Sequence, residues 1–210
     1  MAGLGGTFVY YFNQGGFIMW PLLVLSIIGV IVIIERGWVL YVRARTKTTE
    51  LVSQVRRHLL NGEIEKAAKV CENYRGPTAA IVKAAVLRWG ASREEMEKLL
   101  ENAAIHEIAR LERLVWVLAL ISNIAPILGF LGTVVGMIQS FDVIATQGLN
   151  NPGLVAKGIS VALLTTAGGL IVAVLTLPFY NFFMTKIASY IREMETTANI
   201  ILETHEQARA

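Results

Sequence analysis

Three stretches of the chain contain no charged side chain, and each is long enough to cross a lipid bilayer. Residues 1–34, 114–141 and 158–185 lack Asp, Glu, Lys and Arg. A helix of about 20 apolar residues spans the roughly 30 Å hydrocarbon core. We therefore predict an all-α membrane protein with three transmembrane helices, at residues 17–41, 114–141 and 158–185. Trp38 and Tyr41 would lie at the membrane interface of the first helix.

The distribution of positive charge predicts the orientation of these helices. Of the 19 Lys and Arg residues, 15 lie between Arg36 and Arg113, none precedes the first span, and only Lys157 lies between the second and third. Flanking segments rich in Lys and Arg stay on the cytoplasmic side. Segments 42–113 and 186–210 are therefore expected inside. The Gly-rich interfacial segment 1–16 and the loop 142–157 are expected outside.

The cytoplasmic segments have helical rather than strand periodicity. Asn61 is expected to cap a first helix that ends before Gly76 and Pro77, and a second helix fits residues 78–89. Ser92 and Glu95 have the spacing of a capping box at the start of a third helix. No Gly or Pro interrupts that helix before Pro126, so we expect it to run unbroken into the second span.

The third span is likewise expected to continue as a helix beyond Lys186. Long helices that leave the bilayer on one side would form a bundle there, and neighbouring subunits could cover their apolar stripes.

The sequence contains few of the groups that enzymes and metal sites need. The three histidines, His58, His106 and His205, have no second ligand at metal spacing and are expected on the surface. The interiors of the spans contain no His, Lys, Asp or Glu, and Cys71 is the only cysteine. The positive charge is explained by topology, not by nucleic acid. We therefore expect neither enzymatic activity nor a bound metal or cofactor.

Small residues recur at helical spacing in the second and third spans. Membrane helices associate by close backbone packing, which small residues permit. The spacing alone fits packing either within one chain or around a cavity between chains. Pro126 and Pro178 each remove a backbone hydrogen bond and are expected to bend their helices. The small residues are Gly129, Gly132 and Gly136 in the second span, and Ala162, Thr166, Gly169 and Ala173 in the third.

Four segments, in this order, resemble the ExbB/TolQ branch of the MotA/TolQ/ExbB family. They are "GGFIMWPLLVLSIIGVIVIIERGWVL", "GEIEKAAKVCENYRGP", "APILGFLGTVVGMIQSF" and "GISVALLTTAGGLIVAVLTLPFYNFF", and together they cover about residues 14–185. The third is the most specific of the four. The chain departs from the family at Val161, where a Glu is often found.

The resemblance implies a proton-channel subunit of a motor in the bacterial inner membrane. Such a motor converts the proton motive force into mechanical work on the envelope. Five copies would form a ring around two copies of a single-span partner like ExbD or TolR, and a transducer like TonB or TolA would receive the work. Thr133 and Thr166, with Thr165 as a neighbour, would line the proton pathway and face the partner's membrane aspartate.

The residues themselves agree with this implication in one respect. A proton pathway through a membrane needs a titratable group, and the span interiors of this chain contain none. A second polypeptide would have to supply the acid. Two alternatives remain open. The first is a non-conducting scaffold that anchors an envelope protein, and the second is a solute transporter, which the lack of an inverted repeat disfavours.

Overall fold

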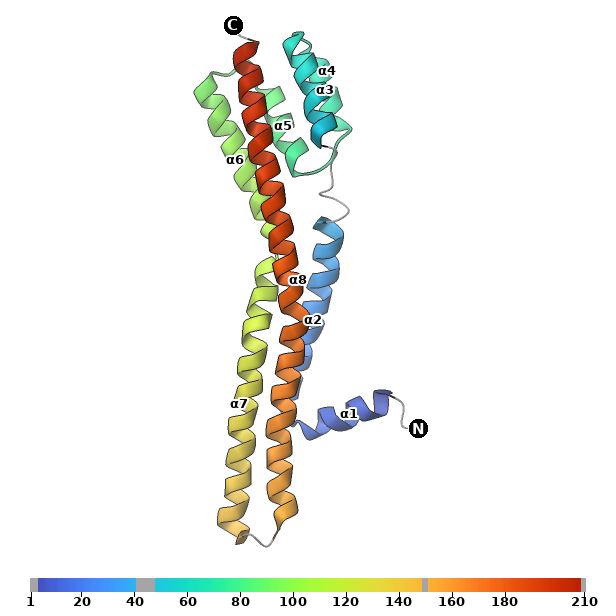
Figure 1. Ribbon diagram of the computed structural model, residues 1–210, viewed down its shortest axis with the longest axis vertical. Coiled ribbons are helices and arrows are strands. Elements are labelled where there is room, and N and C mark those ends of the chain that lie inside the picture. The colour runs from blue at the N-terminus through green and yellow to red at the C-terminus, as the bar shows by residue number, and fades with distance from the viewer. Residues whose placement is uncertain (1–3, 41–47, 149–150, 209–210) are drawn as a thin grey trace. The chain divides into compact units, whose positions relative to one another are not determined.

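The computed structural model describes residues 4–40, 48–148 and 151–208, and most of these are helical (Figure 1). No β-strand occurs within the described residues, which confirms the predicted all-α class. The helices, in chain order, are α1 (Leu4–Gln14), α2 (Met19–Trp38), α3 (Thr48–Leu60), α4 (Ile64–Glu72), α5 (Pro77–Leu87), α6 (Arg93–Glu112), α7 (Val115–Gln147) and α8 (Pro152–Gln207).

The chain divides into two compact units, each built from segments that are distant in the sequence. The first, here called the apolar unit, comprises residues 1–34 and 114–181. The second, the polar unit, comprises residues 35–113 and 182–210. Helix α8 contributes residues to both units and continues without interruption past Lys186, as predicted.

Three helices, α2, α7 and α8, are long and apolar enough to cross a membrane. They correspond to the three predicted spans. Large apolar side chains cover the outside of the apolar unit, and Phe130 and Val174 are 68% and 70% exposed. An apolar surface of this extent is unfavourable in water but is solvated by lipid tails.

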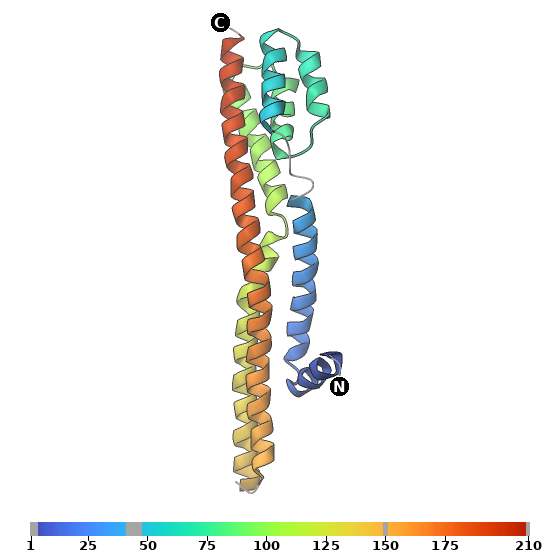
Figure 2. The same ribbon diagram turned by 45° about the vertical axis from the view of Figure 1, so that its right-hand side comes forward.

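The small core of the apolar unit lies where α2 meets α7 and α8. Leu22, Ile121, Ala125 and Val172 form one buried cluster. Helix α1 leaves α2 at an angle, as two views show (Figures 1 and 2). Gly16 permits this turn because its φ of 71° is one that residues with a side chain rarely adopt. The predicted interfacial segment 1–16 thus contains a helix, and Tyr41 lies outside the described residues.

The prediction of one helix from Ser92 into the second span is wrong. Helix α6 ends at Glu112, and α7 begins at Val115. Between them Leu114 has a φ of 65°, a left-handed conformation that costs a non-glycine residue roughly 1–2 kcal/mol. The break falls at the boundary between the two units. No Gly or Pro marks it in the sequence.

The other end of α7 extends further than the predicted span. Asp142 and Lys157, placed in a loop at residues 142–157, both lie on helices, because α7 ends at Gln147 and α8 begins at Pro152. Pro126 lies inside α7 and Pro178 inside α8, and both helices continue through the prolines.

The polar unit has an apolar core to which four helices contribute. Leu51, Ile81, Met96, Met194 and Ile201, from four different helices, are each fully buried. The capping box is confirmed, since Ser92 Oγ accepts from the Glu95 N–H and Glu95 accepts from the Ser92 N–H at 3.0 Å.

One predicted helix end in the polar unit differs from the structure, and another is confirmed. The N-cap of α4 is Glu63 rather than Asn61, which follows α3. Helix α4 ends at Glu72, before Gly76 and Pro77 as predicted, and these two residues also begin the next helix. Gly76 is the N-cap of α5 with a φ of 135°, and Pro77 occupies the first turn.

Candidate functional site

The small residues of α7 and α8 pack against one another within the same chain. On α7 the buried positions Gly129, Gly132, Gly136 and Ser140 recur every three or four residues. On α8 the matching buried positions begin at Gly158 and continue through Ala162, Thr165 and Gly169. This spacing places each set on one face of its helix. Two faces identified separately in the sequence are therefore the two sides of one contact.

The contact is made by backbone atoms, which explains why glycine is needed. A methyl group on Gly136 would lie 2.6 Å from the Gly158 carbonyl oxygen and 2.8 Å from the Ala162 nitrogen. A methyl group on Gly129 would lie 3.0 Å from the Thr165 carbonyl oxygen. A methyl group on Gly169 would overlap the carbonyl oxygen of Ala125. These distances are shorter than carbon–oxygen van der Waals contact, so larger residues would separate the helices.

Thr165 is a packing residue in this structure. Its side chain has no exposed surface and contacts Gly132, where a methyl group would overlap Thr165 Oγ1. The hydroxyl donates within its own helix, with the Val161 and Ala162 carbonyl oxygens both at 3.0 Å. A second chain therefore has no surface of Thr165 to contact.

Thr166, one position further, links the two helices and remains partly accessible. Its hydroxyl lies 3.1 Å from the carbonyl oxygen of Gly129 on α7 and 3.2 Å from that of Ala162 on α8. One hydroxyl proton is shared between these two acceptors. The side chain is only half-buried, so an approaching polar group could reach the Thr166 oxygen.

Thr133 is also half-buried, and its hydroxyl donates to the Phe130 carbonyl oxygen at 2.6 Å. The two threonines named for the proton pathway thus each satisfy their donor on a backbone carbonyl and retain acceptor lone pairs. Pro126 and Ala173, also named for helix shape, are half-buried.

Sequence reasoning did not identify Gly158, which packs against Ser140 of α7. Ser140 Oγ lies 3.1 Å from the Gly136 carbonyl oxygen and 3.0 Å from that of Val155, so it joins α7 to the start of α8. A methyl group on Gly158 would overlap the Ser140 hydroxyl. Extending the α8 spacing four residues back from Ala162 would have identified Gly158.

The polar unit contains one correction to the sequence analysis. His205, expected on the surface, is 1% exposed. Its Nε2–H donates to the Trp89 carbonyl oxygen at 3.1 Å, and the two rings pack edge to face with centroids 5.0 Å apart. Periodicity predicted the helix correctly but did not show which face the rest of the unit would cover.

His58 lies near the surface of the polar unit and pairs with Glu63 at 2.8 Å. Hydrogen bonds from Lys66 and then from His58 hold the pKa of the Glu63 carboxyl below its ordinary value. Within the described parts of the chain, no three His, Cys, Asp or Glu side chains gather as a metal would require.

Comparison with known proteins identifies relatives of this chain. The model of the MotA/TolQ/ExbB proton channel family matches residues 73–196. An ExbB homolog of Methanothermobacter thermautotrophicus is 30% identical over 90% of this chain and 67% of its own length. An ExbB-like protein of Synechocystis sp. is 34% identical over 80% of this chain and 81% of its own length.

A third relative, the biopolymer transport protein ExbB of Pseudomonas putida, is 35% identical over 79% of this chain and 54% of its own length. The family match covers more than half of the chain, from just after α4 through most of α8. This chain, with its three apolar helices and its close contact between α7 and α8, is therefore a membrane protein that belongs to the MotA/TolQ/ExbB proton channel family.

Proposed function

We propose that this chain is the proton-channel subunit of a motor in the bacterial inner membrane that converts the proton motive force into work on the envelope. Copies of the chain form a ring, five by analogy with the family. Two copies of a single-span partner like ExbD or TolR place an aspartate among its helices. The observation that carries this proposal is that the interiors of the spans offer hydroxyl groups but no acid.

The positions of Thr133 and Thr166 support their role as hosts for that acid. Both hydroxyls already donate to backbone carbonyls, so their remaining lone pairs can accept a hydrogen bond from the O–H of a neutral carboxylic acid. To donate to a charged carboxylate, either hydroxyl must rotate and give up its backbone bond. The threonines therefore bind the protonated and the deprotonated acid in different geometries.

This difference gives proton entry a mechanical effect. Protonation of the partner's aspartate changes which hydroxyl geometry it prefers and allows it to move to the next subunit. The membrane potential supplies about 2.3 kcal/mol per 100 mV for each proton. With the N-terminus outside, the polar unit and the C-terminal part of α8 lie in the cytoplasm. The output, by analogy with the names of its relatives, is biopolymer transport driven through a transducer like TonB or TolA.

One observation favours the alternative of a non-conducting scaffold that anchors an envelope protein. The glycines of α7 and the small residues of α8 are occupied by packing within one chain, so they do not require a cavity between copies. The two proposals differ in the role of the threonine hydroxyls. In the channel they bind the partner's acid, whereas in the scaffold they only stabilise the helices.

Valine substitutions at the two threonines test the channel. Thr133→Val and Thr166→Val keep the shape of the side chain but remove the hydroxyl. We expect each to lower proton flux in vesicles that contain the partner by about tenfold while the purified mass of the complex stays unchanged. Thr146→Val and Thr176→Val are matched controls, because both threonines also donate to their own helix. Normal flux in both test variants would refute the pathway.

A further inference from the structure

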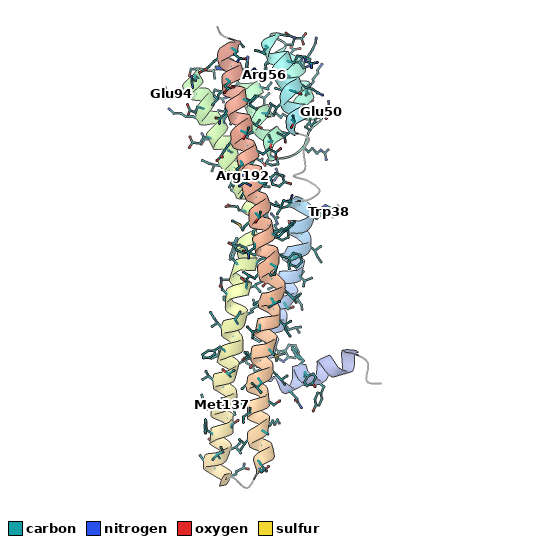
Figure 3. All side chains as sticks on the ribbon, viewed as in Figure 1. Trp38, Glu50, Arg56, Glu94, Met137 and Arg192 are labelled. Carbon is teal, nitrogen blue, oxygen red and sulfur yellow. The ribbon has the colours of Figure 1, made fainter. Side chains whose placement is uncertain are left out.

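Two grooves flank α8 in the polar unit, one on each side of the helix. The first has a volume of about 770 Å³ and lies between α3 and α8. The second has a volume of about 580 Å³ and lies between α6 and α8. Figure 3 shows Arg56 on α3 and Glu94 on α6 on opposite sides of α8.

The groove between α3 and α8 is predominantly basic. Arg56, Arg57 and Arg192 line it together with one acid, Glu193. Arg56 donates to Gln207 at 3.2 Å. Within the described residues, Arg57 and Arg192 have no ion-pair partner, and both side chains are exposed. Leu60, which also lines the basic groove, is 44% exposed.

The groove between α6 and α8 is acidic and has an apolar floor. Glu97, Glu101 and Glu195 line it, and it contains no Lys or Arg. None of these three carboxylates has an ion-pair partner among the residues that the structure describes. Ile105, on the same side of α6 as Glu101, is 57% exposed. Each groove thus combines three like charges with one exposed aliphatic side chain.

We propose that the two grooves are the two halves of one contact between neighbouring copies of this chain. The edge of α6 with Glu97, Glu101 and Ile105 enters the basic groove of the next copy and meets its Arg57, Arg192 and Leu60. The contact pairs an apolar centre with a charged rim, as protein interfaces do. Charge complementarity favours contact between the basic groove of one copy and the acidic edge of α6 of the next. It disfavours contact between two surfaces of like charge.

A second copy fits both grooves better than an unrelated anion does, because the chain itself carries both complementary surfaces. The two surfaces differ, so the contact is head-to-tail, and head-to-tail contacts close into rings when the rotation allows. This inference rests on the homo-oligomer of the proposed function and adds the surfaces that join its cytoplasmic parts. An anion such as phosphate or a lipid headgroup would occupy the basic groove alone.

Crosslinking tests the contact directly. In a Cys71→Ala background, Leu60→Cys and Ile105→Cys are introduced on one chain, and membranes are treated with a short bis-maleimide. We expect a ladder of crosslinked products beyond the dimer. Either cysteine alone should leave the chain monomeric, because Leu60 of one copy would not meet Leu60 of the next. A dimer from a single cysteine, or no ladder from the pair, would overturn the proposal.

Charge reversal in the two-cysteine chain distinguishes a second copy from a bound anion. Arg57→Glu with Arg192→Glu, or Glu97→Arg with Glu101→Arg, should lower the ladder yield by about tenfold. All four substitutions together should restore it, since both sides of every contact are then reversed. If the basic groove only bound an anion, the four substitutions would not restore the yield, and the proposal would fail.

Two controls keep these results interpretable. Lys69→Glu with Arg88→Glu makes the same change in net charge as the two arginine reversals, at exposed positions outside both grooves, and it should leave the ladder intact. Proton flux with the partner is measured separately. A ladder without flux refutes the channel but keeps the contact, whereas flux without a ladder refutes the contact but keeps the channel.

Discussion

At the scale of single residues, two adjacent glycines of α8 have different surroundings. A methyl group on Gly169 would overlap the Ala125 carbonyl oxygen of α7. A methyl group on Gly168 would meet only the side chains of Met19 and Leu22, at 3.4 Å or more. Both glycines lie next to each other on the same helix. Replacing each in turn by alanine therefore distinguishes the effect of backbone packing from the effect of helix propensity.

We expect Gly169→Ala to destabilise the protein by about 1–3 kcal/mol, because α7 and α8 must move apart. Gly168→Ala should change stability by less than about 1 kcal/mol, in the favourable direction, since alanine is the better helix former. Thermal unfolding in detergent compares the two variants. Equal unfolding temperatures would show that the helices do not approach as closely as described.

The capping box of α6 makes stability depend on pH. The Ser92 backbone N–H, and then the Ser92 hydroxyl, lower the pKa of the Glu95 carboxyl below its ordinary 4.5. A carboxyl with a lowered pKa stabilises the fold fully above its unfolded pKa, and this contribution is lost as the pH falls through the folded value.

Glu95→Gln should therefore lower the unfolding temperature at pH 7, and the difference from the native chain should disappear on acidification below about pH 4. Glu94→Gln is the matched control, because Glu94 lies in the same turn but pairs with Lys98 instead of the cap. It should change the unfolding temperature less at pH 7. A difference for Glu95→Gln that persists at pH 3 would contradict this role of the carboxylate.

At the scale of elements, the sequence predicted the three spans and the capping box because each depends on local chemistry. A stretch of 28 residues without charge is typical of a membrane span. The spacing of Ser92 and Glu95 is a local signal for a capping box. The break at Leu114 could not be predicted, because leucine has no intrinsic preference for a left-handed backbone.

The sequence predicted most of the small residues that form the candidate site, but not which helix surface each of them contacts. The spacing of Gly129, Gly132 and Gly136 showed a face adapted for close contact. Spacing carries no information about whether the opposite surface belongs to the same chain. The structure assigns that surface to α8 and places Thr165 inside the contact, while Thr166 remains partly accessible. The burial of His205 was missed for the same reason.

At the scale of the whole molecule, channel and scaffold predict different responses to a collapsed gradient. The isolated chain in vesicles should dissipate little of a proton gradient, because the interiors of its spans contain no acid. Co-reconstitution with the single-span partner should restore flux. In cells, a protonophore should stop the mechanical output of a motor and leave anchoring by a scaffold intact. Efficient proton transport by the isolated chain would contradict the proposed division of labour.

The backbone contact between α7 and α8 also limits where water can enter. Peptide groups that touch at Gly129, Gly136 and Gly169 leave no room for a hydrated file between the two helices. A single subunit is therefore watertight along this seam, so the proposed function places the proton pathway between subunits rather than between these two helices. If that proposal holds, an unassembled subunit should not let protons cross between α7 and α8.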